Sequence, residues 1–372
     1  MDIWGWIGKL KSELRASGRD QAVDSLDRML QHIFNLEVVQ AQALLPEVKA
    51  LVKTLGQPWL EVFVGHWEMR NRVGSLLEGE TALAQVVALF ERANREDAQQ
   101  CPQSVCVTQD LVACYANVDG AGWAEERIAV CDEALQRLDP RWGCFSCMSY
   151  EKADAMLDDG RPEDALAFLD EQQGKILAAG QPIYDCMREV RIAALLRLKR
   201  PEHAWSVMNE WDAGVKGHEW LTERQQRLMY KAQVLAQLHR DDEAWALLLA
   251  EDELIPRYRL FWIRALEELL RRAPERNTQA LADLLQQVIE QHDQQGAHRL
   301  VIQIAAISIP LALKREDLTA ARHHLEMARK HAGQLRRDRG AQALLESLAR
   351  QIDAACPQAE TALLEQFGRQ NL

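Results

Sequence analysis

The sequence predicts an all-α fold of stacked helical repeats, and three observations support this prediction. The hexapeptides at 161–166, 200–205 and 240–245 each begin with arginine and end with alanine and a bulky apolar residue, so one pattern recurs 39 and 40 residues apart. Apolar residues follow three and four positions after each alanine, as on one face of a helix. The chain of 372 residues holds only 19 Gly and 11 Pro, so helix breakers are sparse. A fixed period of this length is typical of an α-solenoid.

The N-terminal region, residues 1–98, is expected to hold helical but degenerate repeats. Trp4, Ile7 and Leu10 form a short apolar face, and the segment lacks the basic start and apolar run of a signal peptide. The turn at Gly18 precedes the next helix. A second turn, at Gly79, precedes a helix that continues through residues 89–93.

The middle region, residues 99–252, holds the clearest repeats. A turn at 119–122 precedes a helix that ends near Asp139 and Pro140. The best unit runs from about 146 to 170, with Ala153 and Ala165 at small positions and a turn at Gly160. Turns at 199–200 and 239–240 take the same place in the next two units, and the extra residues fit loops at 179–182 and 213–218.

The C-terminal region, residues 253–372, interrupts the repeat pattern and then resumes it. Asn277 is a candidate N-cap for a helix with apolar residues at helical spacing between 281 and 289. The apolar run 301–313 is too short to span a bilayer and predicts a buried helix. A turn at 314–317, a final helix at about 341–355 and a polar tail after Pro357 follow, and the three regions are expected to form one continuous array.

These repeats resemble the tetratricopeptide repeat, in which two antiparallel helices with small residues at their crossing form a unit of 34 residues. The resemblance covers residues 100–250 well and the rest loosely. The period of 39–40 is longer than that of the family, and the tryptophan, Leu-Gly and tyrosine signature of the first helix is not matched as a set. The chain is therefore interpreted as a divergent, tetratricopeptide-like solenoid.

The resemblance implies a concave groove lined by the first helix of each pair. Transferred residue by residue, the ligand-facing positions of the family fall on one set of tentative groove residues: His66, Met69, Gln109, Cys147, Tyr150, Asp154, Glu189, Gln226, Met229 and Gln233. The acidic members beside apolar ones would suit an extended segment with basic and apolar side chains. The Lys/Asn clamp that some family members use for C-terminal carboxylates is not visible.

Composition limits the kinds of partner. The formal net charge of −12 argues against general nucleic-acid binding and is compatible with a partner that has a basic surface. No segment is long and apolar enough to predict a membrane span. Eight cysteines in a long chain without an export signal are expected to be reduced thiols, so the predicted location is the cytoplasm.

Several residue clusters could carry chemistry, but each has a plainer interpretation. Cys144 and Cys147 form a CxxC motif that could bind zinc with Cys101 and Cys106, although small thiols at helix crossings commonly serve packing. The histidines at 323, 324 and 331 are expected on a solvated basic face. The segment Arg329–Arg339 could meet an acidic partner or RNA. No catalytic motif or cofactor-binding loop is recognised, so no enzyme activity and no cofactor are predicted.

Six of the eleven tryptophans fall into two groups. Trp205 and Trp245 occupy the same repeat position and are expected to fill equivalent gaps between helices. The other group lies near helix starts or loops, where partial exposure and partner binding are plausible. It comprises Trp59, Trp67, Trp142 and Trp220.

The sequence thus favours a non-enzymatic scaffold or adaptor that binds a protein or peptide in its groove. One alternative is an inhibitory or immunity-type protein that masks a basic enzyme or toxin. Another is a signalling sensor whose array tightens on a peptide. The partner and the oligomeric state are not encoded in any recognisable pattern.

Overall fold

The helical hairpins of the chain turn at residues in the left-handed backbone conformation. Gly160, Lys199 and His239 have φ of 77°, 55° and 59°. In each case the next residue donates its backbone N–H to a carbonyl five residues earlier, as from Arg161 to Met156 at 2.9 Å. This bond closes the Schellman motif that ends many helices. Only the first turn uses glycine, so the lysine and histidine are held in a conformation that costs other residues about 1–2 kcal/mol.

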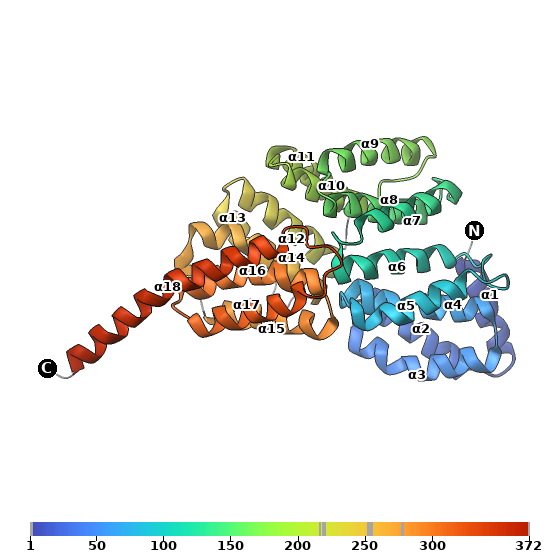
Figure 1. Cartoon of the computed structure of the whole chain (residues 1–372). Helices are drawn as coiled ribbons and strands as arrows, with labels where there is room; N and C mark the ends of the chain where they lie inside the picture. The colour runs from blue at the N-terminus through green and yellow to red at the C-terminus, as the bar shows by residue number, and fades with distance from the viewer. Residues whose placement is uncertain (1–2, 216, 218–220, 251–255, 277–278, 371–372) are drawn as a thin grey trace.

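The computed structural model describes residues 3–215, 217, 221–250, 256–276 and 279–370, and every element it assigns among them is helical. Figure 1 shows the helices in chain order. The first group is α1 (Ile3–Ala16), α2 (Asp20–Phe34), α3 (Val38–Leu55), α4 (Pro58–Met69), the π-helix η1 (Arg70–Ser75), α5 (Glu80–Ala93), α6 (Ser104–Asp119) and α7 (Ala124–Arg137). The second is α8 (Gly143–Asp158), α9 (Pro162–Ala178), α10 (Asp185–Arg197), α11 (Pro201–Gly214), α12 (Leu221–Gln237) and α13 (Asp241–Leu248). The third is α14 (Pro256–Arg272), the 3₁₀-helix η2 (Pro274–Arg276), α15 (Gln279–Gln295), α16 (His298–Lys314), α17 (Leu318–Ala332) and α18 (Ala341–Gln370).

Small residues let the two helices of each pair approach closely. Ala165, Ala204 and Ala244 begin the second helices and have no exposed surface. The tryptophan after two of these alanines fills the space toward the following repeat. The Arg240 guanidinium lies 4.4 Å from the centre of the Trp205 ring, and a similar contact covers Trp245. Cation–π contacts of this kind add to the packing between repeats. The two tryptophans thus occupy equivalent gaps between helices, as their shared repeat position predicted.

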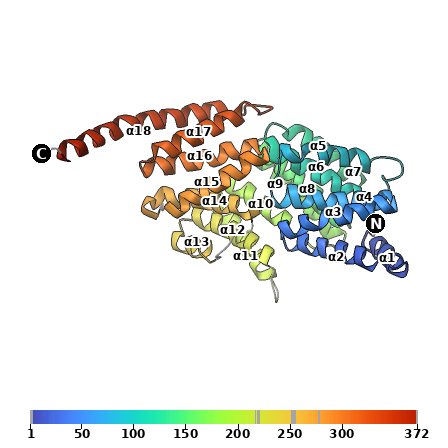
Figure 2. The same cartoon turned by 90° about the horizontal axis from the view of Figure 1, so that it is seen from below.

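The even-numbered helices form the inner layer of an all-α solenoid. α6 contacts α8, α8 contacts α10, α10 contacts α12, α12 contacts α14 and α14 contacts α16. α16 in turn contacts α6, so this layer closes on itself instead of leaving an open trough. Figure 2 shows the C-terminal helices, drawn in orange and red, beside the cyan helices around α5 and α6. The expected solenoid is therefore present, but it is curved into a ring.

Two glycines permit the close approach that closes the ring. Gly79 and Glu80 donate their backbone N–H groups to the carbonyls of Gln295 and Gly296, at 3.1 and 3.2 Å. A Cβ atom on Gly79 would lie 2.7 Å from the carbonyl oxygen of Gly296, and one on Gly296 would lie 2.7 Å from the Glu80 Cβ. Any larger residue at either position would force the two backbones apart.

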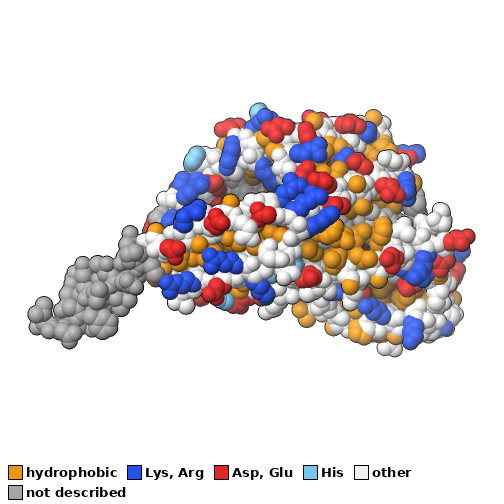
Figure 3. Space-filling view, viewed as in Figure 1, with side chains coloured by type: hydrophobic (Ala, Val, Ile, Leu, Met, Phe, Trp, Pro, Cys, Tyr) orange, Lys and Arg blue, Asp and Glu red, His pale blue; other side chains and the backbone are white. Residues whose placement is uncertain are grey.

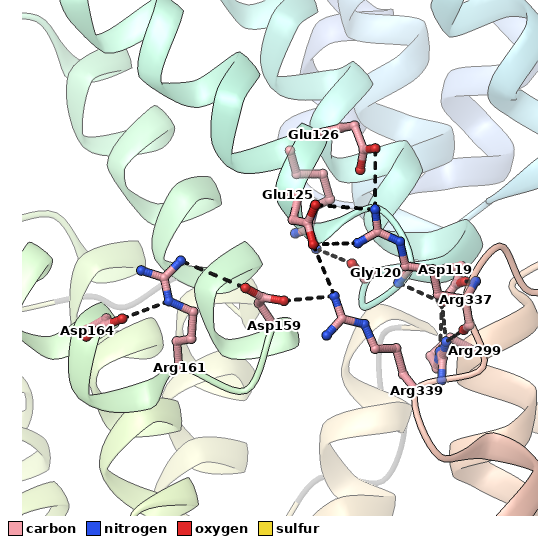
Figure 4. Close-up of polar contacts among 12 residues, drawn as sticks. Asp119, Gly120, Glu125, Glu126, Asp159, Arg161, Asp164, Arg299, Arg337 and Arg339 are labelled. Carbon is pink, nitrogen blue, oxygen red and sulfur yellow. Dashed lines mark hydrogen bonds and ion pairs between the residues drawn. The ribbon is translucent and has the colours of Figure 1, made fainter.

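A buried ion pair completes the closure, and we call it, together with its neighbouring contacts, the clasp (Figure 4). Arg299 at the start of α16 donates from Nε to Asp119 Oδ1 at 2.7 Å, and its other nitrogens donate to the carbonyls of Arg337 and Asp338. The Asp119 carboxylate also accepts the backbone N–H of Gly122 at 3.1 Å and of Arg336 at 3.0 Å. Asp119 has no exposed surface.

The basic segment Arg329–Arg339 supplies the outer part of the clasp. Arg336 pairs with Glu126 and stacks over the Trp123 ring at 3.9 Å. Arg337 pairs with Glu125, and Arg339 with Asp159. Basic and acidic side chains gather at this junction in the space-filling view of Figure 3. These three arginines thus pair with carboxylates of their own chain, and the suggestion that the segment meets RNA or an acidic partner stays a prediction.

Other expectations for the C-terminal region have mixed outcomes. The apolar run 301–313 lies in α16, which is buried on most of its surface as expected. His324 and His331 are buried and not part of a solvated face, because α17 turns them toward α15 and α16. The last helix does not end near 355 but continues as α18 to Gln370. Asn277 and Trp220 lie outside the described residues, and residues 213–214 belong to α11 and not to a loop.

Candidate functional site

The inner helices enclose a cavity of about 460 Å³. Its wall is formed by α2, α4, η1, α6, α8, α10, α12 and α14, so nearly every inner helix supplies part of it. Aromatic side chains from three of these helices, Trp67, Tyr150 and Tyr258, line the cavity together with charged and amide groups. A concave, partly apolar site with a few convergent polar groups is the usual form of a ligand pocket, and its volume lies in the ordinary range for such sites.

Six of the ten groove residues predicted from the sequence line this cavity. They are Gln109, Cys147, Tyr150, Asp154, Glu189 and Gln226. Three of them, on α8, are spaced three and four residues apart and so share one helix face. The repeat alignment therefore located the inner face of α6, α8, α10 and α12.

The other four predicted groove residues do not line the cavity. His66 is buried, and its Nδ1 lies 2.7 Å from Oδ2 of Asp110, which is also buried. Met69 and Met229 are 2% and 0% exposed and belong to the hydrophobic core. Gln233 lies between α12 and α14, where its amide faces the Phe261 carbonyl at 3.4 Å. His66 and Met69 fall in the irregular first repeats, and Met229 and Gln233 lie on sides of α12 that face neighbouring helices.

A buried arginine organises the acidic floor of the cavity. Arg127 is 1% exposed and donates to Asp154 and Asp158, both at 2.7 Å. Burial opposes its charge, but the two carboxylates outweigh this and raise the pKa of Arg127. Asp154 thus has a structural role, because its removal would leave a buried charge without one of its partners.

Two other carboxylates of the cavity lie in unfavourable surroundings for a negative charge. Burial raises the pKa of Glu151 to about 7, although Arg127 opposes the shift. Glu151 Oε1 accepts a hydrogen bond from Gln109 at 3.2 Å. Glu189 is 3% exposed and accepts a hydrogen bond from the Gln226 amide. A cation entering the cavity would relieve the desolvation cost of these groups.

The cavity is also lined by a cation that the sequence analysis missed, Arg70. It begins η1, and a π-turn of this kind often occurs at functional sites. The Arg70 side chain passes over Gly74, where an added Cβ would lie 3.3 Å from its Cδ. Within the described part of the chain, the Arg70 side chain takes part in no hydrogen bond or ion pair, whereas its backbone N–H bonds to the carbonyls of α4. A glycine four residues after an arginine is a weak signal, and the π-turn cannot be read from the sequence.

The tryptophans and cysteines singled out from the sequence lie partly in the cavity and partly outside it. Trp67 lines the cavity, as its predicted partial exposure allowed, whereas Trp59 and Trp142 are partly buried elsewhere. Cys144 lies 3.8 Å from Cys106, measured between the sulfur atoms. In the part of the chain that the structure describes, no group of three or more His, Cys, Asp or Glu residues is arranged to hold a metal ion.

None of the described helices combines the length and apolar character required to cross a membrane. Neither the protein-family models nor the curated proteins include a match to this chain. The functional interpretation therefore depends on the geometry of the cavity and of the clasp.

Proposed function

We propose that this protein is a non-enzymatic, tetratricopeptide-like solenoid that binds an extended peptide segment in its central cavity. The observation that carries this proposal is the convergence of aromatic and acidic side chains from α4, α8, α10 and α14 on one cavity. Rigid helices hold these groups in place before a ligand arrives, which lowers the entropy cost of binding. The seven described cysteines form no disulfides, which supports action in the cytoplasm.

The charges of the cavity favour a segment with a basic side chain. Glu151, Asp154 and Glu189 all line one cavity, and Tyr150 and Tyr258 offer apolar faces beside them. A lysine or arginine of the ligand would approach Glu189 and Glu151, while its aliphatic stem packs on the aromatic rings.

Arg70 adds a second requirement, because its guanidinium lines the same cavity and forms no ion pair with any of the described residues. A carboxylate of the ligand, from an acidic side chain or a free C-terminus, would pair with its guanidinium. The preferred segment therefore carries both charges, with an apolar residue between them or next to them.

The direct test is fluorescence polarisation with a pool of labelled peptides that vary the basic, apolar and acidic positions. Glu189→Gln keeps the shape and removes the charge, so it should weaken binding of the best basic peptide by about tenfold or more, the effect of losing about 1.5–3 kcal/mol from a charged hydrogen bond. Asp185→Asn, on the exposed start of the same helix, is the matched control. Arg70→Gln should weaken only peptides that carry the carboxylate.

Equal affinity of Glu189→Gln and the parent protein for basic peptides would refute the assignment of the cavity. Failure of every peptide in the pool to bind would refute the proposed function itself. Asp154 is unsuitable for this test because it neutralises buried Arg127, so a change there would confuse binding with stability.

The clasp favours one of the alternatives considered from the sequence, a peptide-responsive sensor. We infer that a ring closed by Asp119 and Arg299 can also open, and a ligand that fits only one of the two states would shift the balance between them. Small-angle scattering with and without the best peptide would detect this, since a peptide that leaves the radius of gyration unchanged argues for a passive scaffold.

A further inference from the structure

Two cysteines from successive inner helices meet at one edge of the repeat stack. Cys106 lies in the first turn of α6 and Cys144 in the first turn of α8, and their sulfur atoms are 3.8 Å apart. Both side chains are partly buried and remain free thiols. The sequence grouped the CxxC motif with Cys101 and Cys106 as possible zinc ligands, and the structure places the thiol of Cys106 against Cys144.

The surroundings of the pair give its members different roles. The contact between the two sulfur atoms, with the backbone of the first turn of α8, lowers the pKa of Cys144 to about 7 in spite of burial. The same contact and burial raise the pKa of Cys106 well above its usual range. A thiolate therefore forms at Cys144, with a protonated thiol beside it.

We propose that Cys106 and Cys144 form a redox modification site, in which a hydroperoxide oxidises Cys144 and Cys106 then closes a disulfide between α6 and α8. The inference stands on the contact of the two sulfur atoms and does not depend on the proposed peptide binding. Closing the 3.8 Å separation to an S–S bond of about 2.05 Å needs only a small movement of two side chains in the first turns of their helices.

The chemistry balances with hydrogen peroxide as the oxidant. The Cys144 thiolate attacks one peroxide oxygen, the S–O bond forms and the O–O bond breaks, so that Cys144 becomes a sulfenic acid and hydroxide leaves. The Cys106 sulfur then attacks the Cys144 sulfur, the S–S bond forms and the S–O bond breaks. The departing hydroxyl takes the Cys106 proton as water. The peroxide gains two electrons and the two cysteines lose two.

The cysteines at 147 and 186 are less suitable for this reaction. Burial raises the pKa of Cys147 to about 11 and raises that of Cys186 well above its usual range. Both line the central cavity, one helical turn or more from Cys144. They serve as internal controls because they are cysteines of the same region with little thiolate at neutral pH.

The experiment treats the full chain with hydrogen peroxide, blocks remaining thiols and identifies cross-linked peptides by mass spectrometry. Trypsin places Cys106 in residues 96–127 and Cys144 in residues 142–152. We expect a cross-link between these two peptides that dithiothreitol reverses. Its yield should fall at least tenfold in Cys106→Ser and in Cys144→Ser and remain unchanged in Cys147→Ser and Cys114→Ser.

The intermediate separates the roles of the two residues. Cys106→Ser should accumulate sulfenic acid at Cys144, trapped as a dimedone adduct, whereas Cys144→Ser should give no adduct at Cys106. Circular dichroism confirms that each variant is folded. A disulfide between Cys144 and Cys147, or irreversible oxidation of Cys144 in the parent protein without a cross-link, would overturn the assignment.

Discussion

Replacing Asp119 with asparagine should open the ring while leaving the individual repeats folded. Asp119 is the centre of the clasp, since it accepts hydrogen bonds from Arg299, from Gly122 and from the backbone of the C-terminal segment at Arg336. Asparagine keeps the size of the side chain but replaces one acceptor oxygen with a donor and removes the charge. The Arg299 guanidinium then stays buried without its counter-ion.

The expected loss follows from the burial of the pair. The side chains of Asp119 and Arg299 are 1% and 11% exposed. Removing one partner of a buried pair costs about 3–5 kcal/mol, and the remaining amide oxygen places Asp119→Asn near the lower end. Glu125 and Arg337, by contrast, are 61% and 32% exposed, and exposed pairs contribute about 0.2–1 kcal/mol. Glu125→Gln is therefore the matched control.

Urea unfolding measures the free energy of unfolding of Asp119→Asn and of Glu125→Gln. Hydrogen exchange shows which helices lose stability in each variant. In Asp119→Asn, faster exchange should concentrate in α5, α16 and the segment after α17, with α9 to α11 little changed. The double variant Asp119→Asn with Arg299→Met should lose less free energy of unfolding than the sum of the two single variants, because it no longer buries an unpaired guanidinium. If Asp119→Asn costs no more than Glu125→Gln, or if protection falls evenly over all helices, the clasp is not what closes the ring.

Two further predictions concern the core. Burial lowers the pKa of His292 to about 4, below its ordinary value of 6.5, so the unfolded chain takes up this proton first and stability should fall by up to roughly 3 kcal/mol as pH drops from 6.5 toward 4. Urea unfolding at several pH values should show a smaller loss of stability on acidification in His292→Leu than in the parent protein. An equal loss in both would contradict the assignment of this pH dependence to His292. Ala165→Trp should destabilise the fold by about 1–3 kcal/mol or more through overpacking and so lower Tm, whereas Glu163→Trp on the exposed face of the same helix should not. Equal melting curves for the two variants would contradict the position of Ala165 at the helix crossing.

Local features of the fold could be predicted from the sequence because each depends on a few consecutive residues. The turn at Gly160 and its equivalents, and the buried alanines that follow, are set by spacing within one hairpin. The cavity residues of α8 and α10 follow from the same spacing, since they lie in the best repeat and in the one that follows it. In α8 and α10 every predicted groove position lines the cavity, whereas in α12 Gln226 lines it and Met229 and Gln233 do not.

Features that depend on distant residues could not be predicted. Asp119 and Arg299 are separated by 180 residues, and neither belongs to a recognisable motif. The ring closure therefore has no local signal, and the basic segment that completes it looks like an exposed patch in the sequence. His66 and Met69 fall in an irregular repeat, where a small shift of alignment turns a groove position into a core position. Arg70 depends on a π-turn that propensity alone does not indicate.

The close backbone contact between Gly79 and Gly296 affects how the array of repeats unfolds. An open row of repeats has two ends, and each end can melt while the middle stays intact, because a terminal repeat has a single neighbour. Between α5 and α17 this protein has no such end, since the first and last members of the circle support each other. Loss of any one hairpin in the circle therefore removes two supports at once, and unfolding should occur in a single step over this region.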